Sequence, residues 1–163
     1  MGTFSEYYDS GQLMRLTPFV NNRRQGKLIA LHPNGDTLQV AYFKNDSLLG
    51  HVLSYYESGQ VKSEGFFKDG KPEGMVKEYF RNGQLAKELP HQNGKPNGLS
   101  KTYYESGVPE TEAYYQDGLL NGTYKTYHAN GQLNQEFETH QGHQIGCLPR
   151  VQHRRQTNFR RSL

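Results

Sequence analysis

Strand-favouring aromatic and apolar residues return along this chain in fixed columns, one position every 24 residues. Because adjacent residues of a strand face opposite sides, two neighbouring aromatic columns predict one aromatic stripe on each face of a sheet. Nothing in the chain looks like a helical layer that could cover either face. The first column holds Tyr7, Leu31, Tyr55, Tyr79, Tyr103 and Tyr127, and the second holds Tyr8, His32, Tyr56, Phe80, Tyr104 and His128.

Two series of glycines keep the same 24-residue spacing, and turn residues mark two points in every cycle. Pairs such as Asp69-Gly70 and Asn93-Gly94 are strong hairpin signals, because both central residues of a type I′ turn have positive φ. Each cycle therefore reads as strand, turn, strand, turn. The first series is Gly11, Gly35, Gly59, Gly83, Gly107 and Gly131, and the second is Gly26, Gly50, Gly74, Gly98, Gly122 and Gly146.

A fixed period of this length predicts a repeat architecture, in which each unit contacts mainly its neighbours. The expected fold is all-β: an elongated antiparallel meander of about six 24-residue β-hairpin repeats, forming an open sheet of about twelve strands. The composition agrees, since 33% of residues are hydrophobic, mean hydropathy is −0.92 and Trp is absent. We expect residues 1–147 to form the array and residues 148–163 to form a basic tail.

The repeat motif carries a resemblance to a known family. Its best copies are Tyr55 to Lys62 (YYESGQVK), Asp69 to Gly74 (DGKPEG) and Tyr79 to Leu85 (YFRNGQL). This pattern resembles the bacterial MORN-repeat variant of the YwqK-type antitoxin family over roughly residues 7–147. The resemblance implies a β-hairpin repeat that binds a protein partner, as an antitoxin or immunity component. The first two units depart from it, because Asn22 and Asp46 stand where later units have glycine.

Positive charge is concentrated at the C-terminus. The chain has a net charge of +3, whereas the part before the tail is net −2, because no acid follows Glu138. The tail could grip phosphate, an acidic protein face or anionic lipid, or it could be a solvated terminus. Its arginines are Arg150, Arg154, Arg155, Arg160 and Arg161.

Other candidate chemistry is sparse. His140, His143, Cys147 and His153 are residue types that zinc accepts, but structural zinc sites usually contain paired cysteines, so no metal is expected. Glu64, Glu88, Glu112 and Glu136 form a carboxylate column that reads as a solvent-facing ladder alternating with lysine. The tyrosine column could stack bases or sugars, or it could be the packing element of a thin sheet. No nucleophile elbow or phosphate loop occurs.

A single cysteine excludes an internal disulfide framework and fits a reducing compartment. No apolar stretch reaches the length of a spanning helix. We therefore expect a cytoplasmic protein, or an exported one if a signal peptide has been removed.

The sequence thus predicts a non-enzymatic protein-binding repeat module without cofactor or small-molecule substrate. The alternative is a structural or adaptor subunit of a larger assembly, anchored by its tail. The expected partner is a toxin-like protein or an assembly subunit. The candidate contact residues are Tyr55, Tyr79, Tyr103, Tyr127 and the five tail arginines.

Overall fold

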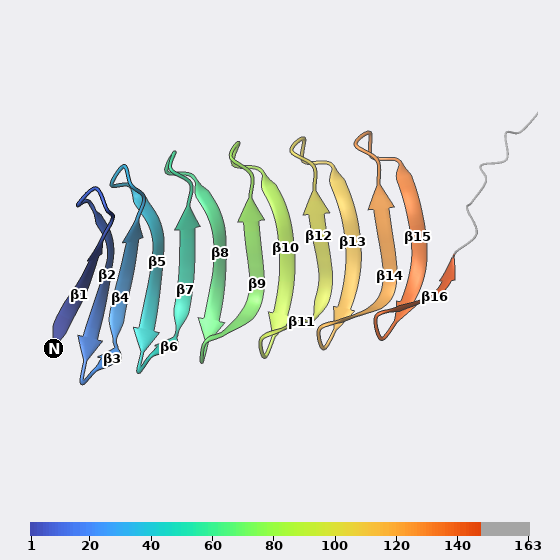
Figure 1. Cartoon of the computed structure of the whole chain (residues 1–163). Coiled ribbons are helices and arrows are strands. Elements are labelled where there is room, and N and C mark those ends of the chain that lie inside the picture. Colours follow the sequence, from blue (N-terminus) through green and yellow to red (C-terminus); the bar gives the residue numbers. More distant parts are fainter. Residues whose placement is uncertain (148–163) are drawn as a thin grey trace, which may run out of the picture.

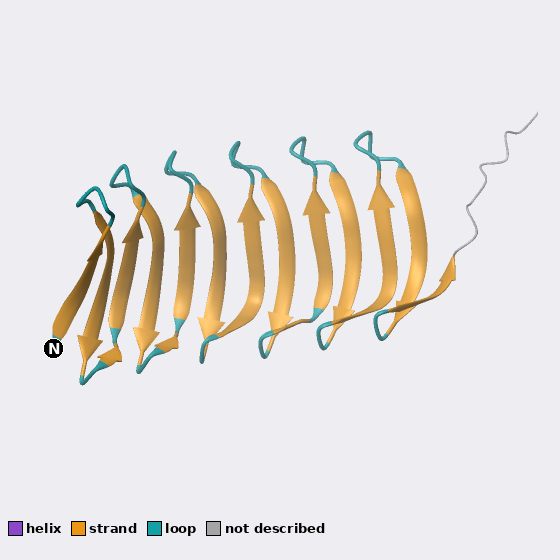
Figure 2. Ribbon diagram, in the orientation of Figure 1, coloured by secondary structure: helices purple, strands orange, loops and turns teal. Residues whose placement is uncertain are grey.

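The computed structural model describes residues 1–147, and the tail at 148–163 lies outside the described residues. Strands and the turns between them account for this part of the chain, and no helix occurs within it (Figure 2). Figure 1 shows the strands side by side in chain order, forming one elongated sheet. The expected all-β hairpin meander is confirmed.

The strands follow one another with short connections. Eight lie in the first half of the chain: β1 (Gly2–Tyr7), β2 (Leu13–Val20), β3 (Arg23–Arg24), β4 (Gly26–Leu31), β5 (Thr37–Lys44), β6 (Ser47–Leu48), β7 (Gly50–Tyr55) and β8 (Val61–Lys68). Eight follow: β9 (Lys71–Tyr79), β10 (Leu85–Gln92), β11 (Lys95–Pro96), β12 (Gly98–Tyr103), β13 (Pro109–Gln116), β14 (Leu119–Tyr127), β15 (Leu133–His140) and β16 (His143–Cys147).

Every strand of the main path pairs antiparallel with the next one along the chain. Three of the 16 strands, β3, β6 and β11, are two-residue pieces beside this path, which leaves 13 strands in it. Each of the six units contributes two strands to the path, and β1 precedes the first unit. Neighbouring segments in sequence are thus neighbours in space, as expected of an array whose units contact mainly adjacent units.

The turns at the lower edge of Figure 1 have the predicted type I′ geometry. Both central residues have positive φ in every one, for example +54° at Asn93 and +84° at Gly94. Asn22 and Asp46, which replace glycine in the first two turns, adopt φ of +59° and +69°. These residue types tolerate the left-handed region because their short polar side chains can form local hydrogen bonds.

Each lower turn after the first also bonds to the preceding repeat. The amide of its second residue donates to a backbone carbonyl 22 positions earlier, as from Gly94 to Pro72 (3.1 Å) and from Gly118 to Pro96 (2.8 Å). Backbone hydrogen bonds therefore link consecutive turns in addition to those between the strands.

The two faces of the sheet differ in packing. On one, here called the packed face, small side chains line up across the strands and are buried, including Ala41 (3% exposed) and Ala113 (4%). In the same row a Cβ added to Gly65 would lie 3.1 Å from Val76 Cγ2, a tight contact that would require the valine side chain to shift. Near the end of the array the row holds larger residues, and the rings of Tyr124 and Phe137 stack with centroids 4.8 Å apart.

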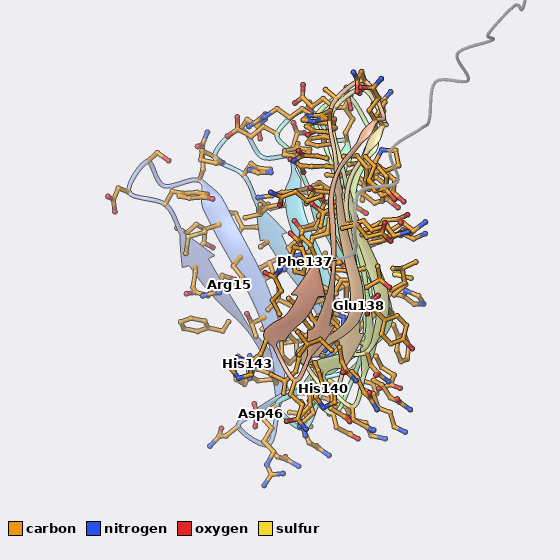
Figure 3. The ribbon with its side chains drawn as sticks, turned by 90° about the vertical axis from the view of Figure 1, so that its right-hand side faces the viewer. Arg15, Asp46, Phe137, Glu138, His140 and His143 are labelled. Carbon is orange, nitrogen blue, oxygen red and sulfur yellow. The ribbon has the colours of Figure 1, made fainter. Side chains whose placement is uncertain are left out.

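The core is one residue layer thick. Within residues 1–147 no large side chain is completely buried, and the packed face carries the Phe19, Phe43, Phe67 and Tyr115 column beside the small residues. Figure 3 shows Phe137 on the packed side of β15 and its neighbour Glu138 on the opposite side. The polar composition follows from this geometry, because a single sheet with no covering layer leaves most side chains in contact with water.

One expectation about the aromatic columns is wrong. Tyr55, Tyr79 and Tyr103 end their strands, but the following residues Tyr56, Phe80 and Tyr104 lie beyond the strand ends. The second column therefore forms no stripe on a sheet face. The strand is terminated at this point by the β-bulge and turn that begin the next half of the hairpin.

Candidate binding surface

The face opposite the packed face carries a continuous row of alternating charges, and we call it the ladder face. Strand register places Glu64 opposite Lys77, Lys77 opposite Glu88, and so on across seven strands to Glu136. Lys101 Nζ lies 3.2 Å from Glu112 Oε1, and Lys125 Nζ lies 3.1 Å from Glu136 Oε1. The expected alternation of the glutamate column with lysine is confirmed. The row consists of Glu64, Lys77, Glu88, Lys101, Glu112, Lys125 and Glu136.

Tyrosine hydroxyls fix the carboxylates of this row. Tyr79 donates to Glu64 Oε1 (2.6 Å), and Tyr103 donates to Glu88 Oε1 (2.8 Å). Tyr127 donates to Glu112 Oε2 at 3.0 Å. Each bond joins residues 15 positions apart, so the 24-residue repeat produces it in three consecutive units. The result is a lattice in which tyrosine, glutamate and lysine hold one another in place.

The tyrosines of this lattice have raised pKa values. The hydrogen bond to Glu64, with burial, raises the pKa of Tyr79 to about 12. Burial and the hydrogen bond to Glu88 raise the pKa of Tyr103 to about 12, and burial followed by the bond to Glu112 raises that of Tyr127. The hydrogen bond to Glu136 likewise raises the pKa of Lys125. The phenols are therefore neutral donors at physiological pH, and none is poised as a base or nucleophile.

The same row continues toward the N-terminus without charge. Glu64 pairs with Leu53, and the row then runs through Val40, Ile29 and Leu16. Tyr55 is the tyrosine of this region, and the position that supplies a glutamate in later repeats is Val40. Within residues 1–147 the Tyr55 hydroxyl has no hydrogen-bond partner. The ladder face thus changes from apolar to charged along its length.

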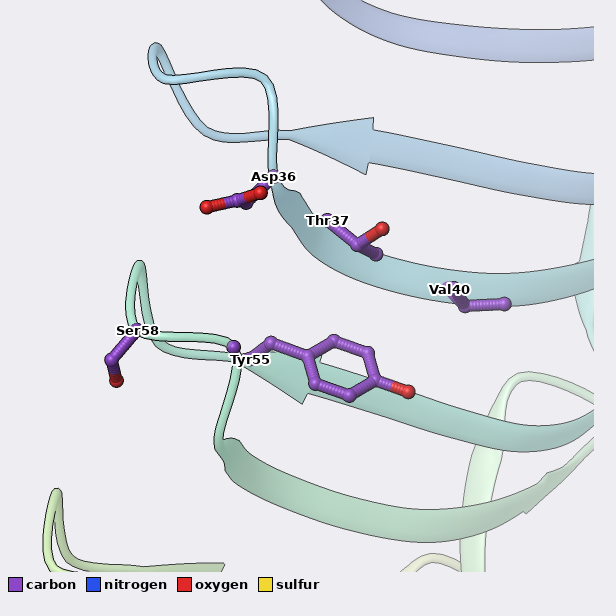
Figure 4. Close-up of a pocket in the computed structure, with 6 residues that line it drawn as sticks. Asp36, Thr37, Val40, Tyr55 and Ser58 are labelled. Carbon is purple, nitrogen blue, oxygen red and sulfur yellow. The ribbon is translucent and has the colours of Figure 1, made fainter.

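A shallow hollow of about 400 Å³ lies beside Tyr55. Figure 4 shows the Tyr55 ring on β7 next to Thr37 and Val40 of β5, with Asp36 and Ser58 at the turns. A second hollow of about 490 Å³ lies at the other end of the face, lined in part by Leu99, Tyr114 and Lys125. Both are open depressions on a sheet surface, suited to partner side chains.

The residues just after the tyrosine column bind successive repeats together. Tyr8 donates its hydroxyl to the Leu31 carbonyl (2.7 Å), and Tyr56 donates to the Tyr79 carbonyl (2.7 Å). Tyr104 donates in the same way to Tyr127, and His32 Nε2 lies 3.0 Å from the Tyr55 carbonyl. Phe80 occupies the column between Tyr56 and Tyr104 and has no hydroxyl, so it cannot form this bond.

The candidate contact tyrosines share one row. Tyr55, Tyr79, Tyr103 and Tyr127 are half-buried on the ladder face, where three of them hold a glutamate. The candidate residues Arg150, Arg154, Arg155, Arg160 and Arg161 lie outside the described residues. The structure also reveals an exposed apolar row that we had not singled out, although Tyr42, Phe66 and Tyr114 repeat with the 24-residue period.

Metal ligands do not gather in the part of the chain that the structure describes, where no three His, Cys, Asp or Glu residues converge. His140 and His143 face each other across the last hairpin, and His140 Nδ1 lies 3.0 Å from Asn121 Oδ1. His153 lies outside the described residues. Residues 1–147 also contain no helix that could cross a membrane.

Comparison with known proteins identifies a protein family that matches the chain. The family described as the MORN repeat variant matches residues 2–21, 48–69, 72–93, 96–117 and 120–140. No curated protein matches the chain. The five segments coincide with the hairpins β1–β2, β7–β8, β9–β10, β12–β13 and β14–β15, and together they make up more than half of the sequence. This protein therefore belongs to the MORN repeat variant family.

Proposed function

We propose that the protein is a non-enzymatic binding module that recognises a protein partner through its ladder face. The observation that carries this proposal is the tyrosine–glutamate–lysine lattice, in which side chains are held in fixed positions before any partner arrives. Ordered side chains lose little conformational entropy on binding, so a preorganised surface favours affinity. Tyrosine adds large contact area at low entropic cost.

Membership of the MORN repeat variant family is consistent with a non-enzymatic binding function. MORN repeats are generally modules that bind proteins or membranes, and the repeat is non-catalytic. In this chain the carboxylates of the row are engaged by lysine or tyrosine, and the raised pKa of Tyr79 and Tyr103 leaves their phenols protonated. Reaction chemistry would need a group held ready for proton transfer or attack, whereas these groups are neutralised by one another.

The proposed mechanism is steric: the long, rigid sheet covers part of the partner's surface and blocks access to it. In the antitoxin-like form of the proposal, the ladder face covers the working surface of a toxin-like protein. In the alternative form, the chain is an adaptor or structural subunit, and the arginine tail anchors it to an assembly. A one-to-one complex with a toxin-like protein supports the first form, and recovery at fixed stoichiometry with a large complex supports the second.

Affinity capture from the native organism, read out by quantitative mass spectrometry, tests the proposal. The test variant carries Lys77→Gln, Lys101→Gln and Lys125→Gln, which remove the positive charges of the ladder while retaining polar side chains. The matched control is Lys87→Gln, because Lys87 lies on the packed face. Circular dichroism confirms that each variant is folded. We expect one protein to be enriched by the wild type and by the control and to be lost with the triple variant.

Two results would refute this assignment of the surface. One is that no protein is enriched over unloaded resin. The other is that the triple variant captures the same protein as the control with equal yield, which would place recognition elsewhere.

A further inference from the structure

An exposed row of large apolar side chains runs along the ladder face beside the charged row, and we call it the apolar stripe. Strand pairing places Leu99 opposite Tyr114, and Phe66 opposite His51, whose rings meet edge to face with centroids 5.3 Å apart. The stripe holds five of the twelve exposed large hydrophobic residues of residues 1–147. These are Tyr42 (46% exposed), Phe66 (38%), Met75 (41%), Leu99 (43%) and Tyr114 (46%).

The stripe is one residue wide, and from β8 to β13 the charged row runs along one side of it. Phe66 lies two positions after Glu64 on β8, so both side chains are on one face, with the charged row next to the stripe. Two positions further along the strands, toward the lower turns, lysines follow. This lysine rim consists of Lys44, Lys68, Lys71 and Lys95, all exposed. Among residues 1–147 none of these four lysines forms an ion pair.

The spacing of the stripe selects the conformation of a ligand that lies along it. Tyr42, Phe66, Pro90 and Tyr114 belong to successive hairpins, and each hairpin contributes two strands. With strands about 4.8 Å apart, equivalent positions recur about every 9.6 Å. A polyproline II helix advances about 3.1 Å per residue with three residues per turn, so it repeats about every 9.3 Å. Same-side residues of a β-strand recur about every 6.8 Å, and one turn of an α-helix rises about 5.4 Å, so neither matches.

We propose that the apolar stripe binds an extended polyproline II segment of a partner protein, with proline or another apolar residue at every third position. Acidic residues of the segment face the lysine rim. Successive turns of the polyproline II helix then each place one apolar residue against one of the four side chains Tyr42, Phe66, Pro90 and Tyr114. This inference rests on the proposed protein-binding function and specifies its ligand.

Charge complementarity determines which side chains the segment carries. The unpaired lysines offer positive charge along the lower side of the stripe, so acidic residues on that side of the ligand gain attraction. On the other side, Lys77, Lys101 and Lys125 alternate with four glutamates, so that row has a net charge of −1 and offers no excess of positive charge to the ligand. The hollow next to Leu99 and Tyr114 gives room for a larger ligand residue at that end.

A lipid surface fits the stripe less well. Inserting Tyr42 and Phe66 into a headgroup layer would bring Glu64, Glu88 and Glu112 toward the same plane. These carboxylates would be repelled by anionic headgroups and would lose hydration. A linear polypeptide can contact the stripe and the lysine rim without covering the glutamates.

Fluorescence anisotropy with a labelled peptide of four Pro-Pro-Glu triplets tests the proposal. Such a peptide spans about 37 Å, enough to cover a stripe of six strand intervals, or about 29 Å. We expect saturable binding that weakens with added salt. Phe66→Ser and Tyr114→Ser should each raise Kd at least tenfold. The matched control Tyr7→Ser, which removes an exposed aromatic residue on the edge strand β1, should leave Kd unchanged.

Peptides and vesicles of other kinds complete the test. Peptides of Gly-Ser-Glu triplets, which lack the polyproline II conformation, and of Pro-Pro-Lys triplets should bind at least tenfold more weakly. Vesicles of phosphatidylserine and phosphatidylcholine should show no cosedimentation that depends on Phe66. The proposal is overturned if the Pro-Pro-Glu peptide does not bind, if Tyr7→Ser weakens it as much as Phe66→Ser, or if the vesicles bind through the stripe instead. Partner capture that depends on the ladder lysines would still uphold the protein-binding function in each of these cases.

Discussion

Gly94 and Gly118 occupy the same position in consecutive lower turns, yet alanine should cost more at Gly94. Both have positive φ, +84° and +91°. An L-residue in the left-handed conformation costs about 1–2 kcal/mol, and this cost is common to both sites. The sites differ in their surroundings. A Cβ at Gly94 would lie 3.0 Å from Lys71 Cβ, whereas at Gly118 the nearest atom, Lys95 Cβ, would be 3.8 Å away.

The difference between the two variants isolates the contact with Lys71. The Cβ of Lys71 is attached directly to the backbone and cannot rotate away, so the turns must shift apart. Such overpacking costs about 1–3 kcal/mol. We therefore expect Gly94→Ala to lower the free energy of unfolding by about 2–5 kcal/mol, and Gly118→Ala by about 1–2 kcal/mol. In a chain of this size each kcal/mol lowers Tm by about 2–4 °C.

Urea unfolding followed by circular dichroism, with hydrogen exchange at the affected turn, measures both variants. Hydrogen exchange is needed because one region of a repeat array can unfold before the rest. A background with Lys71→Gly provides the control, because it removes the Lys71 Cβ that the new side chain at Gly94 would meet at 3.0 Å. Equal losses for the two alanine variants, or an unchanged Gly94→Ala, would refute the contact between turns as the source of the difference.

The other predictions concern the aromatic columns and the tail. Phe80→Tyr should supply the missing hydroxyl bond to the Tyr103 carbonyl and raise the free energy of unfolding by about 0.5–1.5 kcal/mol, measured by urea titration; a loss of stability would contradict it. The pKa of Tyr79 and of Tyr103 is raised to about 12, so their contribution to stability is complete below about pH 10, the unfolded value, and is lost as pH rises to about 12. Tyrosinate absorbance should show late-titrating groups, one of which disappears in each of the Tyr79→Phe and Tyr103→Phe variants, and titration of all tyrosines near pH 10 would exclude the hydrogen-bonded arrangement. Truncation after Cys147 should leave the circular dichroism spectrum of the sheet intact while weakening capture of the partner, and unfolding of the truncated chain would show instead that the tail caps the sheet.

Much of the fold could be predicted because the repeat makes every local signal recur. The lower turns follow from Asn-Gly and Asp-Gly pairs, and the structure confirms positive φ at Asn93 and Gly94. Antiparallel neighbours follow from short turns, since a hairpin leaves its second strand no other place to pair. The alternation of glutamate with lysine could also be anticipated, because both recur with the same period.

Strand register, and with it the surface, was decided only by the tertiary structure. Which glutamate meets which lysine depends on pairing across strands, as does the 15-residue step that brings the Tyr79 hydroxyl to Glu64. The sequence placed Tyr56 and Tyr104 in a strand column, whereas the bulge at the strand end moves them beyond it and directs their hydroxyls to the next repeat. The apolar stripe was hidden for the same reason: its members come from β5, β8, β9, β12 and β13. The 24-residue period determines the strands and turns of each unit. Which side chains lie next to one another on the sheet surface is determined only by the strand register between units.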